Sequence, residues 1–153
     1  MKKVYQRIVD IGHGDCMQSS IASMFDEEYE NVPPFVELGT EWWEKFEEYF
    51  ASKGYKWKTV LYNPIMWDKT HKDSSLDRLK EFNGVNGLFY ATVCSPKYNT
   101  NGELSGILHA VVVDKDFNIV HDPNPMNINI KYPHYEDIYH GIRTVEVFEP
   151  IEN

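Results

Sequence analysis

The sequence predicts one domain in which helices combine with antiparallel strands. Three observations predict this architecture. Residues 17–25 and 41–52 carry apolar side chains at helical spacing, and the alternation over residues 107–123 predicts a β-hairpin. The chain of 153 residues shows neither an internal repeat nor a low-complexity tract. That length suffices for one substantial core and is short for two ordinary domains, so we expect a single domain over residues 1–153.

The chain is acidic, with a formal net charge of −9. Nucleic-acid backbones and anionic membranes attract clustered Lys and Arg, so this charge argues against both as the main partner and favours a cationic or neutral substrate. The stretch of residues 1–4 is basic because it contains Lys2 and Lys3, but Arg7, Asp10 and His13 interrupt the sequence after it. No signal-peptide core and no run of transmembrane length results. We expect a cytoplasmic protein of a bacterium or of a phage-infected host cell.

The first predicted helix begins beside a cysteine. Its apolar face consists of Met17, Ile21, Met24 and Phe25. Asp15 is a favourable N-cap, which puts Cys16 in the first turn, where unpaired N–H groups and the positive end of the helix dipole stabilise a thiolate. Glycines on both sides of His13 let the backbone approach a ligand closely. Cys16 is therefore a candidate nucleophile, and the alternative is a small structural residue at a helix start.

The middle of the chain is expected to be scaffold. One face of the helix over residues 41–52 is aromatic and predicts core packing: Trp42, Trp43, Phe46, Tyr49 and Phe50. Gly54 is a plausible helix stop before a strand over residues 55–62, and a short helix is predicted from Ser74 to Phe82. The two cysteines are far apart in a chain without an export signal, so both are interpreted as free thiols. Cys94 ends an apolar strand and is expected to be an inert core thiol.

The predicted hairpin joins a histidine to an aspartate. If its loop is symmetric, Asp114 faces Phe117, and His109 then stands directly opposite Asp122 on one face of the sheet. A hydrogen bond between the two side chains is within reach. Strand alternation turns His121 to the opposite face. The pair is either the base and base-orienting carboxylate of an active site or a buried polar pair with no catalytic role.

Two strings of residues resemble one enzyme family. The string 14–16 with its following helix, and the strands over residues 108–113 and 119–123, resemble the papain-like cysteine peptidases of the bacteriocin-processing, double-glycine leader peptidase branch, small members of which occur in phages and bacteria. The likeness runs over about residues 6 to 125, and only these blocks are specific. It implies a papain-like α+β fold, with an N-terminal nucleophile-bearing helix packed on an antiparallel β-sheet, and a triad of Cys16, His109 and Asp122.

The chain departs from that family at two positions. A glutamine a few residues before the cysteine helps to form the family's oxyanion hole, whereas Gln6 lies ten residues before Cys16. Gln6 reaches the site if residues 11–14 form a bulged loop. Otherwise His13, or backbone N–H groups near Cys16, must stabilise the oxyanion. Met17 stands where the family usually has a small residue.

The triad predicts thiol acyl transfer on an amide, peptide or isopeptide, the chemistry of a thiol protease or amidase. His109 exchanges the proton, Cys16 attacks the carbonyl carbon, and Asp122 holds the imidazole. This chemistry requires no cofactor. The substrate itself is not encoded in any recognisable motif.

Two other classes of function remain open at this point. A papain-like binding module without useful catalysis would capture a ligand or block a partner protein, through loops around Trp67 and Asn124. A metal hydrolase would draw its ligands from Cys16, His13, His109, His121 and Asp122. These residues lack a compact metal-binding spacing such as HExxH, and strand alternation separates the last two, so we predict no metal site. A phosphate-binding role lacks its glycine-rich loop.

Overall fold

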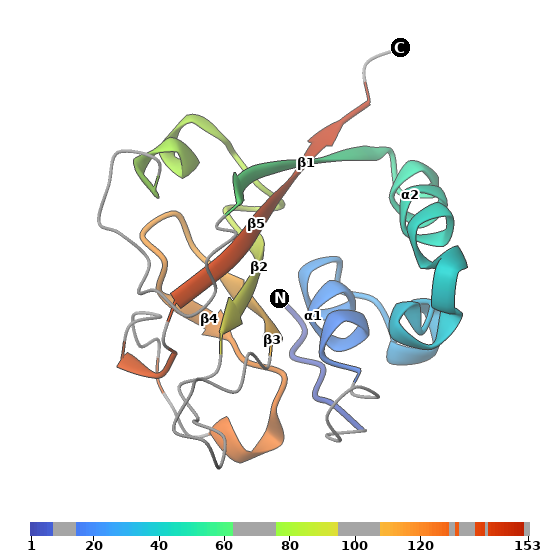
Figure 1. The fold of residues 1–153 in the computed structure, drawn as a ribbon, viewed down its shortest axis with the longest axis horizontal. Coiled ribbons are helices and arrows are strands. Elements are labelled where there is room, and N and C mark those ends of the chain that lie inside the picture. The colour runs from blue at the N-terminus through green and yellow to red at the C-terminus, as the bar shows by residue number, and fades with distance from the viewer. Residues whose placement is uncertain are drawn as a thin grey trace.

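The computed structural model describes residues 1–7, 15–62, 76–94, 108–128, 131, 137–139 and 141–151. Two α-helices and five strands form its framework (Figure 1): α1 (Cys16–Met24), α2 (Trp42–Ser52), β1 (Tyr55–Tyr62), β2 (Phe89–Cys94), β3 (Leu108–Val113), β4 (Ile119–His121) and β5 (Gly141–Pro150). Four 3-10 helices accompany them: η1 (Tyr29–Asn31), η2 (Phe35–Glu41), η3 (Leu76–Glu81) and η4 (Pro125–Asn127). Helices on an antiparallel sheet confirm the predicted α+β class.

The sheet has the strand order β1-β5-β2-β3-β4, and every neighbouring pair is antiparallel. The last strand of the chain, β5, thus lies between β1 and β2 (Figure 1). This arrangement leaves β1 at one edge of the sheet and the short strand β4 at the other. Since β4 pairs only with Val112 and Val113, the first half of β3 has no strand on that side within the described chain.

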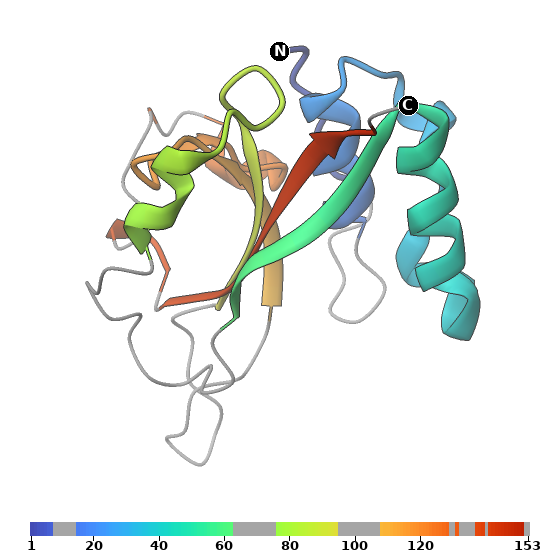
Figure 2. The same cartoon turned by 90° about the horizontal axis from the view of Figure 1, so that it is seen from above.

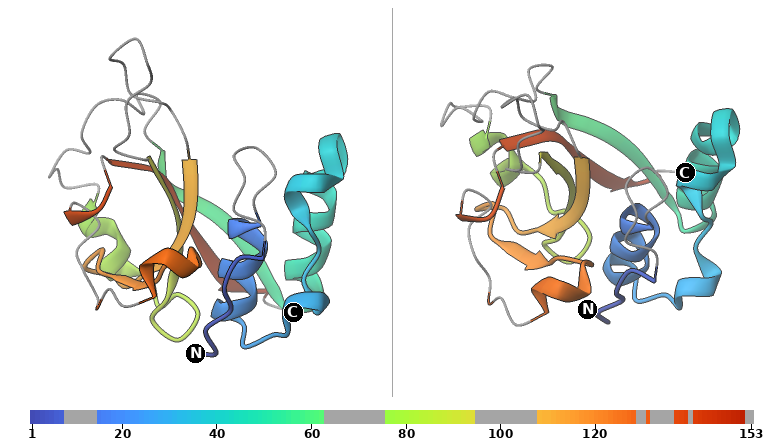
Figure 3. Two further views of the ribbon diagram at one scale, coloured as in Figure 1. Left: turned by 90° about the horizontal axis from the view of Figure 1, so that it is seen from below. Right: turned by 60° about the horizontal axis from the view of Figure 1, so that its bottom comes forward.

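Helix α1 packs against β3 and β2 on one face of the sheet, with η1, η2 and α2 on its other side (Figures 2 and 3). The sequence predicts one buried face for this helix, but every residue from Gln18 to Met24 is buried. Its polar side chains therefore need partners: Gln18 Nε2 donates to Val32 O at 2.9 Å, and Ser20 Oγ donates to Ala110 O at 3.2 Å. These bonds tie the helix to both of its neighbours.

Fewer aromatic side chains of α2 are buried than its sequence predicts. Phe46, Tyr49 and Phe50 are buried as predicted, whereas Trp42 and Trp43 are 37% and 43% exposed. The expectation that both tryptophans belong to the core is therefore wrong. The three buried rings are spaced i, i+3, i+4 and fill the contact between α2 and the sheet. The first turn of α2, with both tryptophans, therefore lies at the margin of that contact.

The structure largely agrees with the sequence-based predictions for the middle of the chain. Gly54 ends the α2 region with φ +83°, a conformation that favours glycine, and β1 then covers the predicted strand. The short helix expected from Ser74 is a 3-10 helix, η3, and its first two predicted residues lie outside the described chain. Cys94 ends β2 with 1% of its surface exposed, and burial raises the pKa of its thiol.

Candidate active site

The hairpin between β3 and β4 differs in register from the symmetric one predicted. Asp114 N donates to Asn118 O at 3.0 Å and Phe117 N donates to Asp114 O at 3.1 Å, so the loop has three residues and Phe117 takes φ +64°. A bulge at Val120 then shifts the pairing once more, to Val112 opposite His121. The predicted register is wrong by two residues. Because side chains alternate with a period of two, that shift returns Asp122 to the face expected for it.

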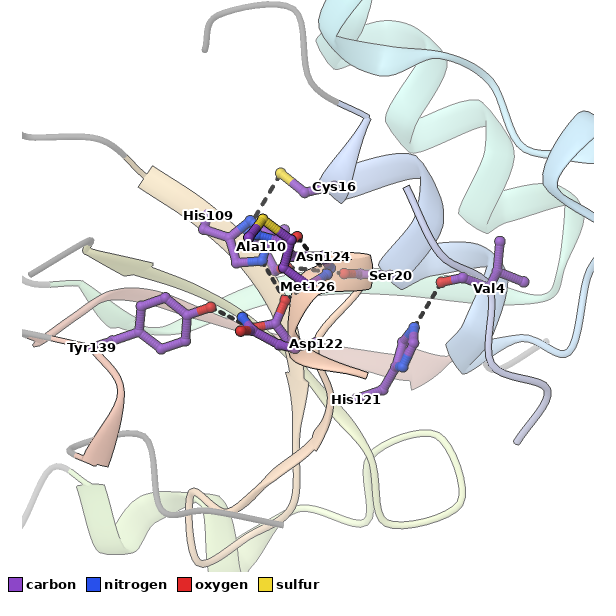
Figure 4. A network of polar contacts seen from close by, with 11 residues as sticks. Val4, Cys16, Ser20, His109, Ala110, His121, Asp122, Asn124, Met126 and Tyr139 are labelled. Carbon is purple, nitrogen blue, oxygen red and sulfur yellow. Dashed lines mark hydrogen bonds and ion pairs between the residues drawn. The ribbon is translucent and has the colours of Figure 1, made fainter. Parts of the chain in front are cut away.

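His109 and Asp122 are in direct contact. His109 Nε2 lies 2.6 Å from Asp122 Oδ1 (Figure 4), the pairing that the sequence predicts, although the two residues are not directly opposite each other. His121 points away from this pair, also as predicted. Its Nε2 lies 2.7 Å from Val4 O, and its ring packs edge-on against Tyr5 at 4.9 Å between centroids.

The carboxylate of Asp122 is held by four groups. Oδ1 accepts from Asn124 N at 3.0 Å besides contacting His109. Oδ2 accepts from Asn127 Nδ2 at 3.0 Å and from the Tyr139 hydroxyl. Burial by itself would raise the pKa of Asp122, but the bonds with His109, Tyr139 and Asn124 outweigh it and hold that pKa below its usual value. Asp122 is therefore an ionised carboxylate fixed in one orientation.

Two of these donors were not identified from the sequence. Asn127 lies in the turn after Pro123, where an amide five residues from an aspartate is a weak but readable signal. Tyr139 comes from a separate segment before β5, and no local pattern connects it with Asp122. Its ring also lies 5.9 Å from that of His109, so it borders the imidazole as well as the carboxylate.

Cys16 is the first residue of α1, as predicted, and α1 attaches it to β3. Cys16 Sγ accepts from Ala110 N at 3.4 Å, and Ser20, one turn further along α1, donates to Ala110 O (Figure 4). Both backbone groups of Ala110 are available because β4 does not extend alongside this part of β3. The sulfur is thereby placed next to His109, the neighbour of Ala110 in the chain. Ser20 was not identified from the sequence.

His109 interacts with the side chains of both Cys16 and Asp122, and each of them favours the charged form of its ring. Asp122 contacts Nε2, which leaves Nδ1 for the sulfur. Burial alone would lower the pKa of His109, but its bond to Asp122 and its interaction with Cys16 raise it to about 9. The imidazolium is thus the favoured form at neutral pH, between a carboxylate and a thiol that it can stabilise as a thiolate.

The prediction that the Asp15 side chain caps α1 is wrong. It occupies the N-cap position with φ −104° and ψ 29°, and its side chain makes no cap hydrogen bond. Instead Oδ2 accepts from Arg7 N at 3.0 Å and from the Tyr29 hydroxyl at 2.6 Å. The Arg7 guanidinium lies 3.9 Å above the Tyr29 ring and binds Glu30 at 2.6 Å. Asp15 therefore holds the N-terminal segment against the start of α1.

The contact between Arg7 and Asp15 brings together the two ends of the segment that separates Gln6 from Cys16. Gln6 N also donates to Pro123 O at 2.8 Å, so its backbone lies beside the residue after Asp122. Gln6 is therefore near the site despite its distance in the sequence. The bulged loop expected over residues 11–14 lies outside the described residues.

Two other residues singled out in the sequence, His13 and Trp67, lie outside the described residues. Asn124 lies at the site, where its backbone binds Asp122 and its side chain caps η4 by accepting from Met126 N at 3.0 Å. Asn124, one of the two loop residues expected to contact a ligand, thus lies beside Asp122.

No family model, curated protein or solved structure matches this chain. Across the described ranges, no helix has the length and apolar character needed to cross a bilayer. The same residues contain no group of three or more His, Cys, Asp or Glu side chains arranged to hold a metal ion.

Proposed function

We propose that this chain is a cysteine hydrolase that cleaves an amide, peptide or isopeptide bond through a triad of Cys16, His109 and Asp122. One observation carries the proposal: the His109 ring bonds to a buried carboxylate and interacts with the first-turn cysteine of α1, whose sulfur accepts a hydrogen bond from the neighbouring Ala110 N. The order of these residues and the likeness of their motifs to papain-like, double-glycine leader peptidases support the same assignment.

The reaction would begin with the Cys16 thiolate beside the His109 imidazolium. The thiolate attacks the carbonyl carbon and forms a C–S bond, and the carbonyl oxygen becomes an oxyanion. His109 donates its proton to the amine as the C–N bond breaks, which leaves an acyl thioester on Cys16. Water then attacks the thioester while His109 accepts its proton, and the acid product and the thiolate are released. No other reactant is required.

Asp122 would orient the ring of His109 and stabilise its charged form. The four groups that bind the carboxylate keep it ionised and prevent it from rotating. Gln6 remains the first candidate for the oxyanion donor, because the bond from its backbone to Pro123 keeps it beside the site. His13 is the second candidate. The loss of one such donor typically lowers the rate by about a hundredfold or more.

The alternative function is a binding module that retains this geometry without turnover. The substitution Cys16→Ala, with Cys94→Ala as its matched control, separates the two. We expect a thiol-reactive amide mimic such as chloroacetamide to modify the protein rapidly and only at Cys16, as measured by intact mass. In His109→Ala this modification is expected to be slow. We also expect Cys16→Ala, but not Cys94→Ala, to abolish the biological effect. A well-folded Cys16→Ala protein with its full effect would contradict the hydrolase and favour the binder.

A further inference from the structure

A groove lies between α2 and the edge strand β1, where β1 runs beside the helix (Figure 2). It encloses about 430 Å³ and is lined by Trp43, Glu47, Ala51, residues 55–59 and Ile151. A space of that size is in the range of sites that bind a ligand or several side chains. None of the triad residues lines it, so the groove is separate from the candidate active site.

The floor of the groove is aromatic and open. Trp43 packs edge-on against Trp57 at 4.6 Å between ring centroids, and 43% of Trp43 remains exposed. Ile151, the residue after β5, also lines the groove and is 42% exposed. Exposed tryptophans over a concave surface are typical anchors for a binding partner.

The backbone of β1 offers hydrogen bonds along this groove. Strand β1 is the edge of the five-stranded sheet, and within the described chain it pairs only with β5. An edge strand presents alternate N–H and C=O groups outward, and an extended peptide can add to them as a further strand. Such a peptide would lie between β1 and α2, along the residues that line the groove.

The charge on β1 restricts what can occupy the groove. Residues 53–62 contain three lysines and no acidic residue, although the whole chain carries a net charge of −9. Lys56 and Lys58 are exposed and alternate with Trp57, so they lie on the opposite face of the strand. A second copy pairing through β1 would bring these lysines against each other, which is unfavourable. An acidic strand would complement them.

We propose that the groove binds an extended peptide of alternating acidic and apolar residues, added to β1 as a sixth strand. Residues paired with Trp57 would place apolar side chains against Trp43, and their neighbours would place carboxylates beside Lys56 and Lys58. This is a function in addition to hydrolysis and does not depend on the triad.

The test uses a short fluorescein-labelled peptide of alternating valine and glutamate, titrated with the full chain and followed by fluorescence anisotropy. We expect saturable binding, and at least about tenfold weaker binding for an alternating valine–lysine peptide and for the Val–Glu peptide with N-methylated backbone. The proposal would be overturned if the Val–Glu peptide did not bind, or if the valine–lysine peptide or the N-methylated peptide bound equally tightly. A protein that dimerises through β1 instead would overturn it too.

Matched variants locate the binding. Trp43→Ala is expected to weaken binding about tenfold or more, whereas Trp42→Ala, exposed one residue earlier and outside the groove, leaves it within about twofold. Lys58→Glu is expected to weaken it severalfold, and Lys115→Glu, on the exposed turn of the β3–β4 hairpin, only slightly. Equal effects within either pair would contradict the assignment. Binding must persist in Cys16→Ala, and thermal melting of the groove variants shows that they are folded.

Discussion

The two faces of the β3–β4 hairpin each hold one largely buried histidine, and the pKa values of the two imidazoles are shifted in opposite directions. The pKa of His109 is raised to about 9, whereas burial lowers that of His121 below its usual value. Asp122 favours the charged form of both rings. The difference is that His109 bonds directly to the carboxylate, while Nε2 of His121 bonds to the carbonyl of Val4. In a protein interior a direct bond to an ionised group therefore decides the charge state, and proximity alone does not.

The largest expected effect comes from replacing that carboxylate. Asp122→Asn removes the charge that stabilises the His109 imidazolium, so we expect hydrolysis to fall by about a thousandfold to ten-thousandfold while the fold persists. Asp114→Asn, in the turn of the same hairpin, is the matched control and is expected to leave the rate unchanged. The measurement is turnover of an amide substrate, with thermal melting as the folding check. An Asp122→Asn protein with more than a tenth of the original rate would refute the role of Asp122.

The two thiols extend the comparison to the nucleophile. Cys16 interacts with His109 and accepts a hydrogen bond from Ala110 N, whereas Cys94 is 1% exposed and burial raises the pKa of its thiol. Near neutral pH we expect iodoacetamide to modify Cys16 at least about a hundredfold faster than Cys94, measured by intact mass in the single cysteine variants. His109→Ala should slow the reaction of Cys16. Equal rates for both thiols, or no change in His109→Ala, would count against an activated nucleophile.

The pH dependence of stability should separate the two histidines. Folding favours protonated His109, so its contribution to the free energy of unfolding is present below its usual pKa of 6.5 and is lost as the pH rises towards about 9. Folding disfavours protonated His121, so its contribution is present above 6.5 and is lost as the pH falls through its lowered pKa. The rise in the pKa of His109 from 6.5 to about 9 corresponds to a contribution of about 3 kcal/mol.

Urea unfolding across this pH range measures both contributions. His109→Gln is expected to flatten the loss of stability on the alkaline side, and His121→Gln the loss on the acidic side. If each substitution instead flattened the other side, the opposite charge states of the two rings would be disproved.

The smallest expected effect concerns two buried tyrosines. The Tyr139 hydroxyl donates to Asp122, whereas the Tyr49 hydroxyl is buried and has no hydrogen-bond partner in the described chain. Tyr139→Phe is therefore expected to lower the free energy of unfolding by about 1–3 kcal/mol, and Tyr49→Phe to leave it nearly unchanged. Chemical denaturation measures both. The idea that Tyr139 supports the carboxylate fails if the two substitutions cost the same.

Local patterns predict most elements, but not the register or the capping. The limits of α2 and β1 follow from periodicity and from Gly54, since those signals act over a few residues. The predicted hairpin register is wrong because Phe117 adopts a left-handed conformation and Val120 forms a bulge, and neither is predicted by the residue type. The position of Asp15 alone predicts a cap, but Tyr29 and the backbone of Arg7 compete for its oxygens. Such competition is visible only when distant segments are placed together.

The sequence by itself determined which side chains form the candidate triad, because the start of α1 and the alternation of β3 and β4 are local properties of the chain. Only the tertiary structure decided the state of those side chains. The charge of Asp122 depends on donors from three separate places, His109, the turn at Asn124 and Asn127, and Tyr139. The position of Cys16 depends on the backbone of Ala110, which is accessible to it because β4 is short. A carboxylate buried without those donors would be neutral, and no sequence pattern encodes their convergence.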